Sequence, residues 1–179
     1  MPEVRKYLAL TALGAHRETL TADLISAVEK RGCDIVECRL APLGRQVTAA
    51  LLIAGNWSAL GKLESALPGL AEQLDLQLHY AHTENPDLAP DFRPYAAEVS
   101  APQQSGLLGE LVGFFHGQGA RVVEITSQGY DSGYTGGAMC GVHIALQVPM
   151  TQHPQTLRES FMDLCDDLHA DGMLDPIKS

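Results

Sequence analysis

The chain has 179 residues, of which 45% are hydrophobic and 19% are charged, and its formal net charge at pH 7 is −10. These values are typical of a folded soluble protein and argue against disorder. The negative charge, together with the lack of any run of Lys or Arg, argues against direct binding to DNA or RNA, because such a surface repels the phosphate backbone.

The apolar stretch near the N-terminus predicts a β-strand and not a targeting segment. Residues 7–12 are too few for the hydrophobic part of a signal peptide or for a membrane span, and His16, Arg17 and Glu18 follow soon after. We therefore expect a cytoplasmic protein whose first element is a strand.

The rest of the first half predicts a helix, two strands, a second helix and a last strand. Gly32 ends the first helix, as glycine just past a helix commonly does. Strands at 33–40 and 47–54 flank a turn at 42–44 and predict a hairpin. Alternating apolar residues from Leu74 to Tyr80 predict the last strand. The two helices are marked by apolar residues at helical spacing: Leu20, Leu24, Ala27 and Val28, then Leu60, Leu63, Leu67 and Leu70.

Strict alternation divides the strand at 33–40 into two faces. It places Val36, Cys38 and Leu40 on one side and Ile35, Glu37 and Arg39 on the other. Glu37, and Glu124 at the equivalent place in the second half, are expected on the face turned away from the helices. Paired carboxylates could support acid–base chemistry, but no nucleophile or metal set accompanies them, so a structural role is favoured.

Residues 84–94 have the composition of a linker, with three prolines among acidic and polar residues. They separate a predicted domain at 1–83 from another at 95–179. The second half predicts its own series of strands and helices, with Gly119 ending the first helix and Pro154 beginning the second. The predicted strands are at 95–100, 122–126, 142–148 and 173–177.

The same motif occurs twice, 87 positions apart. Residues 20–37, LTADLISAVEKRGCDIVE, are echoed by residues 107–124, LLGELVGFFHGQGARVVE. A period this long that occurs only twice indicates paired domains and not a solenoid. We predict an α+β protein of two tandem ferredoxin-like βαββαβ domains, each an antiparallel four-stranded sheet with two helices on one face.

Several segments resemble a known family, the glycine cleavage system transcriptional repressors, which are tandem ACT-domain proteins. The segments are LTALGAHRETL, GCDIVECRLAPLG, QVTAALLIAGNWSAL, QQSGLLGELVGFF and YTGGAMCGVHIALQVP, and the resemblance runs from about residue 7 to about residue 168. It implies a non-enzymatic regulator without cofactors or a DNA-binding domain of its own. Such a regulator would repress transcription by contacting a LysR-type activator, with glycine or another amino acid as its effector.

The resemblance places an amino-acid site at the loop between the first strand and first helix of a domain. ACT domains often read Asp-Arg-Pro-Gly there, but residues 16–19 and 103–106 of this chain keep only Arg17 and Gly106. A small residue lets a carboxylate approach the helix N-terminus, so the second half is the better candidate. The candidate ligand-binding residues are Gly14, Ala15, His16, Arg17, Gln103, Gln104, Ser105, Gly106 and Leu107.

Each of these residues also has a plainer interpretation. Arg17 could pair with a ligand carboxylate, but equally with Glu18 or with water. Gln103, Gln104 and Ser105 could form a polar cap before the helix, with Ser105 as an ordinary N-cap residue.

The glycine-rich segment 128–137, QGYDSGYTGG, is interpreted as a long loop. It lacks the Lys-Ser/Thr ending of a phosphate-binding loop and does not fit GxGxxG, so a nucleotide site is not expected. A loop that contacts a partner or covers a ligand is one hypothesis, with Tyr130 and Tyr134 as contact residues. A solvated loop without a special role is the other.

No catalytic or metal site is expected. The histidines lie on separate elements without an HExxH motif, and no Ser-His-Asp or Cys-His arrangement is recognisable. The four cysteines are scattered, so we expect free, buried thiols. The alternative function is an amino-acid-binding regulatory subunit of a metabolic enzyme, and a homodimer formed through sheet edges or an uncovered sheet face is compatible with either function.

Overall fold

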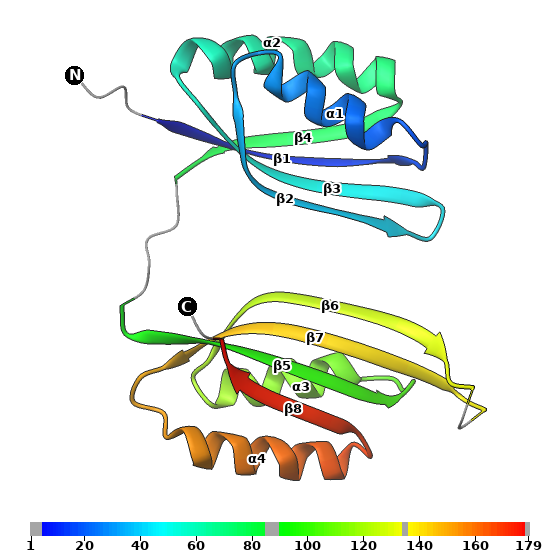
Figure 1. Ribbon diagram of the computed structural model, residues 1–179, viewed down its shortest axis with the longest axis vertical. Coiled ribbons are helices and arrows are strands. Elements are labelled where there is room, and N and C mark those ends of the chain that lie inside the picture. The colour runs from blue at the N-terminus through cyan, green and yellow to red at the C-terminus, as the bar shows by residue number, and fades with distance from the viewer. Residues whose placement is uncertain (1–4, 85–89, 134–135, 178–179) are drawn as a thin grey trace. The chain divides into compact units, whose positions relative to one another are not determined.

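The computed structural model describes residues 5–84, 90–133 and 136–177, and the chain divides into two compact units, residues 1–87 and 88–179 (Figure 1). The first unit contains β1 (Lys6–Ala15), α1 (Leu20–Glu29), β2 (Asp34–Leu43), β3 (Gln46–Gly55), α2 (Trp57–Leu74) and β4 (Leu76–Thr83). The second contains β5 (Phe92–Pro102), α3 (Leu107–Gly117), β6 (Arg121–Asp131), β7 (Ala138–Pro149), α4 (Pro154–Asp167) and β8 (Asp171–Pro176). Strand β5 thus includes the last three residues of the predicted linker.

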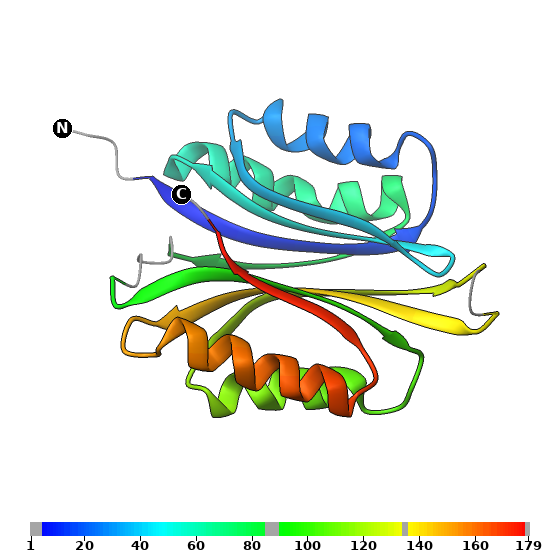
Figure 2. The same cartoon turned by 60° about the horizontal axis from the view of Figure 1, so that its bottom comes forward.

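Each unit is a four-stranded antiparallel sheet with two helices on one face, as predicted (Figure 2). The strand orders are β2-β3-β1-β4 and β6-β7-β5-β8, so the first strand of each unit lies between two partners. Alternate residues of β1 and β3 point into the core, where they meet the apolar stripes of α1 and α2. The second unit repeats this arrangement with a core that includes Phe115 and Phe161. The prediction of two ferredoxin-like domains is therefore confirmed.

A β-bulge corrects the predicted faces of the strand at 33–40. The register between β2 and β3 shifts between Ile35 and Glu37, which adds one residue to β2. As a result Ile35 packs against the core, whereas Val36 is 45% exposed. Glu37 pairs with Leu52 and lies on the face without helices, as expected.

The same bulge occurs 87 positions later. The register between β6 and β7 shifts between Val122 and Glu124, so Val122 packs against the core and Val123 is 56% exposed. The duplication therefore reproduces an irregularity of the sheet as well as its regular elements.

Glycines end the first helix of each unit, as predicted. Gly32 and Gly119 have φ angles of 78° and 75°, in the left-handed region that glycine adopts at little cost. Their N–H groups donate to Glu29 and His116 over 2.9 Å in both cases. Each chain reversal leads directly into the bulged strand.

Leu74 is the last residue of α2, and not the start of the last strand. The helix continues through Pro68, Asp75 turns left-handed with φ 51°, and β4 begins at Leu76. Leu74 satisfies the helical spacing that runs through Leu67 and Leu70 as well as the alternation of β4, so the pattern alone could not decide between them.

The first four residues of the segment 128–137 are strand, and its other described residues lie between strands, as the loop prediction expected. Strand β6 extends to Asp131 and β7 begins at Ala138, so Tyr130 lies in β6 and not in a loop. Tyr134, the other predicted contact residue, lies outside the described residues. The sequence pattern did not predict this part of β6, because its glycines and polar residues are typical of loops.

The cysteines do not all match the expectation of buried thiols. Cys33 and Cys165 are buried free thiols, but Cys38 is exposed and Cys140 is partly buried. Burial, with a contribution from the Asp34 carboxylate, raises the pKa of Cys33. Burial, with contributions from Asp166 and Asp171, likewise raises the pKa of Cys165.

Within the described residues, no helix is long and apolar enough to cross a membrane.

Replacement of Gly172 by alanine should destabilise the second unit. A Cβ there would lie 2.3 Å from Cys165 Sγ and 3.0 Å from the Phe161 ring, both fully buried. We expect a loss of about 1 to 3 kcal/mol in unfolding free energy. Gly61→Ala is the matched control, since Gly61 is the fifth residue of α2 and its Cβ would meet nothing within 4 Å; this change should stabilise the first unit by about 0.5 to 1 kcal/mol. Urea unfolding followed by circular dichroism measures both; equal tolerance of the two changes would contradict the packing.

Thiol labelling should separate the four cysteines. At mildly alkaline pH, Cys38 should react quickly with a disulfide reagent, because its side chain is exposed. Cys33 and Cys165 should react slowly, because burial excludes the reagent and a raised pKa lowers their thiolate fraction until the pH passes that pKa. Mass spectrometry over time identifies the labelled residues, and denatured chain serves as the control in which all of them react.

Candidate functional site

The loop between β1 and α1 is the predicted ligand site of the first unit, and its first predicted residue, Gly14, is tightly packed. A Cβ at Gly14 would lie 2.4 Å from Leu76 Cδ2 and 2.7 Å from the Asp75 carbonyl oxygen. Gly14 is therefore required by the close approach of the start of β4. Ala15 ends β1 opposite Gln46, and the His16 N–H donates to the Arg45 carbonyl over 3.4 Å.

Arg17 binds the protein's own backbone. Its Nη2 donates to the carbonyl oxygen of Leu74, the last residue of α2. The carbonyls at a helix C-terminus lack intrahelical partners and carry partial negative charge, so a guanidinium is well suited to this position. The Arg17 side chain thus joins the β1–α1 loop to the end of α2, a contact that the sequence did not suggest.

The space beneath the start of α1 is too small for an amino acid. It is a void of about 10 Å³. That volume holds at most about one water molecule. The void is lined by apolar residues, namely Ala12, Leu20, Leu24, Leu40, Val47, Ala49 and Leu76.

The second unit repeats the Arg17 contact with a neutral side chain. Gln104, 87 positions after Arg17, donates from Nε2 to the carbonyl oxygen of Leu168 over 3.2 Å. Leu168 is the C-cap residue of α4, and the next residue, His169, is left-handed with φ 52°, as Asp75 is after α2. In each unit, the loop between the first strand and the first helix is therefore hydrogen-bonded to the end of the second helix. The donor is charged in the first unit and neutral in the second.

Gly106 makes the β5–α3 loop more open than its counterpart. It is the N-cap of α3 with φ 88°, and a Cβ there would meet nothing within 4 Å. No side chain caps this helix, so Ser105 does not act as the N-cap that the sequence suggested. The first N–H groups of α3 thus begin at an exposed glycine, which is the geometry a carboxylate needs.

The other predicted residues of this loop have different surroundings. The Gln103 N–H donates to the Ala138 carbonyl over 2.9 Å, and its Oε1 lies 3.9 Å from the place where a Cβ of Gly129 would stand. Leu107 is buried in the core, so only its backbone could meet a ligand. The structure therefore brings Gln103, Gln104, Ser105 and Gly106 together on one exposed loop.

Tyr130 spans the sheet of the second unit. Its hydroxyl and the Ser100 hydroxyl are 2.7 Å apart and share a hydrogen bond across β7. The ring edge passes over Gly141, whose Cβ position lies 3.7 Å from Tyr130 Cε1. Tyr130 thus connects the edge strand β6 to the central strand β5 on the face without helices, although it remains 46% exposed.

Among the described residues, no group of three or more His, Cys, Asp or Glu side chains could hold a metal ion. Glu37 forms an ion pair with Arg39, with 2.9 Å between Oε2 and Nη1. Both side chains are about half exposed, and such surface pairs contribute little to stability. What remains as a candidate site is the β5–α3 loop, whose amide groups and helix N–H groups suit a small zwitterion.

The sequence does not predict the partners of Arg17 and Gln104. Only the 87-residue shift, which aligns these two residues, indicates that they share a role. Their acceptors, Leu74 and Leu168, lie 57 and 64 residues away, and only the folded chain brings them close.

Comparisons with known proteins agree with this fold. A family model described as the ACT domain matches residues 6–81. The chain is 26% identical over 171 residues to the glycine cleavage system transcriptional repressor of Escherichia coli strain K12, an alignment that covers 96% of this chain and 90% of that protein.

Two solved structures extend the similarity to both units. One is a crystal structure of a protein assigned provisionally to the glycine cleavage system transcriptional repressors, with a TM-score of 0.71 at 25% identity over 98% of this chain and 99% of that chain. The other is an unknown protein from Galdieria sulphuraria, with a TM-score of 0.75 at 18% identity over 98% and 100% of the two chains. The second similarity concerns the fold alone.

The contact of Arg17 with Leu74 should be measurable by its effect on the first unit. Trp57 is the only tryptophan, so its fluorescence follows unfolding of that unit. Arg17→Met should lower the unfolding free energy reported by Trp57 by about 1 kcal/mol, because a charge-assisted hydrogen bond to the partly buried end of α2 is lost. Gln104→Met removes the matching hydrogen bond of the second unit and should not change the unfolding transition reported by Trp57. An unchanged transition in Arg17→Met would contradict this role.

Proposed function

Because the chain contains an ACT domain and resembles the glycine cleavage system transcriptional repressors along nearly its whole length, we propose that it is a non-enzymatic, cytoplasmic repressor of glycine cleavage genes. It acts through contact with a protein partner, a LysR-type activator, and responds to glycine or another small amino acid.

The observation that carries this proposal is the extent of the similarity. The alignment with the Escherichia coli repressor covers 96% of this chain, so both units and not one shared module correspond to that protein. A similarity confined to one ACT domain would be compatible with many regulated enzymes, because folds of this kind serve unrelated functions.

The charge of the chain supports action through a protein. A net charge of −10 disfavours contact with the phosphate backbone, and neither half carries a run of basic residues. An acidic regulator instead complements a basic surface, such as that of a DNA-binding partner, and electrostatic complementarity speeds their association. Repression then consists of occupying or altering the activator and not of covering its operator.

The β5–α3 loop is the effector site in this proposal. A glycine carboxylate would accept hydrogen bonds from the first N–H groups of α3, where Gly106 leaves the approach open. The side-chain amide of Gln103 and nearby backbone carbonyls offer acceptors for the ammonium group. The β1–α1 loop of the first unit is the weaker candidate in this proposal, because Arg17 is engaged with the Leu74 carbonyl and Thr19, where the second unit has Gly106, brings a branched side chain to the start of α1.

A pull-down with the purified LysR-type activator tests the partner. We expect the full chain to retain the activator, and glycine to change the amount retained. A gel-shift assay with operator DNA should show no shift with this chain alone and an altered shift when the activator is present. Failure to associate with the activator, with and without glycine, would overturn the proposal, as would recovery of a metabolic enzyme as the main partner.

Calorimetry with glycine tests the effector site separately. Gly106→Ala should weaken glycine binding at least tenfold, because a side chain at the helix N-terminus displaces the carboxylate. The binding free energy lost is roughly that of one charged hydrogen bond. Arg17→Met is the matched control in the first unit and should leave glycine binding unchanged. The opposite result would move the effector site to the β1–α1 loop.

A further inference from the structure

A second cavity lies at the other end of β1 from the loop of Gly14 and Arg17. It has a volume of about 550 Å³ and is formed where β1 begins, α2 begins and β4 ends. This volume is within the range of small-molecule sites, about 300 to 1,000 Å³. Its lining residues all belong to the first unit: Arg5, Lys6, Tyr7, Trp57, His82, Thr83 and Glu84.

The cavity presents an exposed aromatic surface. Trp57 is 74% exposed, and its ring stacks on that of His82 with 6.5 Å between the ring centroids and 14° between the planes. His82 is held in turn by Glu64, with 3.0 Å between Nε2 and Oε1. The indole is therefore oriented from one side while most of its surface remains accessible, which is the arrangement of a stacking platform.

Positive charge lies beside this aromatic surface. The Arg5 guanidinium is paired with the Asp34 carboxylate, whereas the exposed Lys6 lines the cavity. The N-terminus of α2 is capped by the Asn56 side chain, which accepts a hydrogen bond from the Ala59 N–H over 2.8 Å, so Lys6 is the cation of this cavity without a partner inside the cavity lining. The Lys6 ammonium favours a small anion, and the Glu84 carboxylate, which also lines the cavity, disfavours large polyanions.

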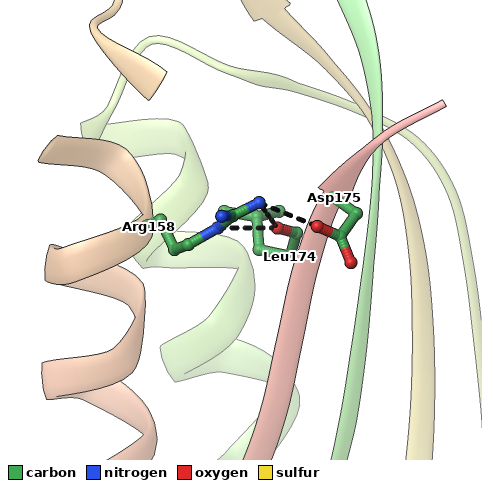
Figure 3. A network of polar contacts seen from close by, with 3 residues as sticks. All are labelled: Arg158, Leu174 and Asp175. Carbon is green, nitrogen blue, oxygen red and sulfur yellow. Dashed lines mark hydrogen bonds and ion pairs between the residues drawn. The ribbon is translucent and has the colours of Figure 1, made fainter. Parts of the chain in front are cut away.

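The second unit has a smaller cavity with a different lining at the corresponding place. The cavity there is about 360 Å³ and lies between the start of α4 and the end of β8. Arg158 donates from Nε and Nη2 to the Leu174 carbonyl over 3.3 and 3.2 Å, and its Nη2 is 2.8 Å from Asp175 Oδ1 (Figure 3). The Arg158 guanidinium is thus paired with groups of its own unit. Among the described residues, no tryptophan or histidine lines this cavity.

The helix ends identify the matching residues. Asp75 and His169 are the left-handed residues after α2 and α4, and counting back eleven residues from each gives Glu64 and Arg158. Glu64 pairs with His82 of β4, whose ring stacks on Trp57, whereas Arg158 pairs with Asp175 of β8. The first unit thus presents an exposed tryptophan and a lysine where the second has a surface ion pair.

We propose that the cavity of Trp57 and Lys6 binds a small planar aromatic anion, a heteroaromatic ring that bears a carboxylate or a phosphate. The ring stacks on Trp57, and the anionic group meets the Lys6 ammonium. This site does not depend on the proposed repressor function, and its ligand differs in class from the small amino acid proposed for the β5–α3 loop.

Fluorescence of Trp57, the only tryptophan, tests the ligand class directly. Adenosine 5′-monophosphate and nicotinate serve as probes with a phosphate and a carboxylate. Adenosine and nicotinamide supply neutral rings, and inorganic phosphate and acetate supply anions without a ring. We expect saturable quenching by at least one ring-bearing anion, with affinity about tenfold or more above that for its neutral and ringless counterparts. The stronger of the two probes identifies the preferred anionic group.

Calorimetry with the better probe locates the site. Trp57→Leu and Lys6→Gln should each weaken binding about tenfold, as expected for loss of one stacking or one charged contact. Arg158→Gln, at the matching place in the second unit, and Lys62→Gln, on α2 outside the cavity, should leave the affinity unchanged. Circular dichroism checks that each variant is folded.

Three results would overturn the proposal. They are no binding of either ring-bearing anion in the millimolar range, equal binding of the neutral rings or ringless anions, and unchanged affinity in folded Trp57→Leu.

Discussion

The position of the first strand between two partners is the constraint on which each unit depends. β1 is hydrogen-bonded along its length to β3 and β4, and β5 to β7 and β8. A central strand of this kind fixes which residues face the helices and leaves both of its ends next to loops from other elements. At the C-terminal end of β1, Gly14 packs against the start of β4 and Arg17 binds the carbonyl of Leu74. The cavity lined by Lys6 and Trp57 lies at the N-terminal end of β1.

The two units keep one backbone but use different chemistry at matching places. The bulge, the left-handed glycine after the first helix and the left-handed residue after the second helix all occur twice. The side chain that ties the first loop to the end of the second helix is Arg17 in one unit and Gln104 in the other. Backbone geometry is constrained by hydrogen bonding in both copies, whereas surface side chains can change at little cost in stability.

The two proposed sites lie at opposite ends of the central strands and use different groups. The β5–α3 loop offers the uncapped N-terminus of α3 at Gly106, where helix N–H groups are unpaired. The cavity beside α2 offers the Trp57 ring and the Lys6 ammonium, whereas the smaller cavity beside α4 is lined by Arg158, which pairs with Asp175.

The sequence by itself determined the fold. The apolar spacing and the glycines after the first helices predict each element because they are local signals, and the 87-residue repeat shows that the βαββαβ unit occurs twice. Only the tertiary structure decided that Ile35 faces the core, that Tyr130 crosses the sheet to Ser100 and that Arg17 binds Leu74. It likewise decided that Trp57 lines a cavity with Lys6. Each of these facts depends on which distant residue a side chain meets, and cross-strand register and helix docking set that partner, whereas the periodicity of one segment carries no information about it.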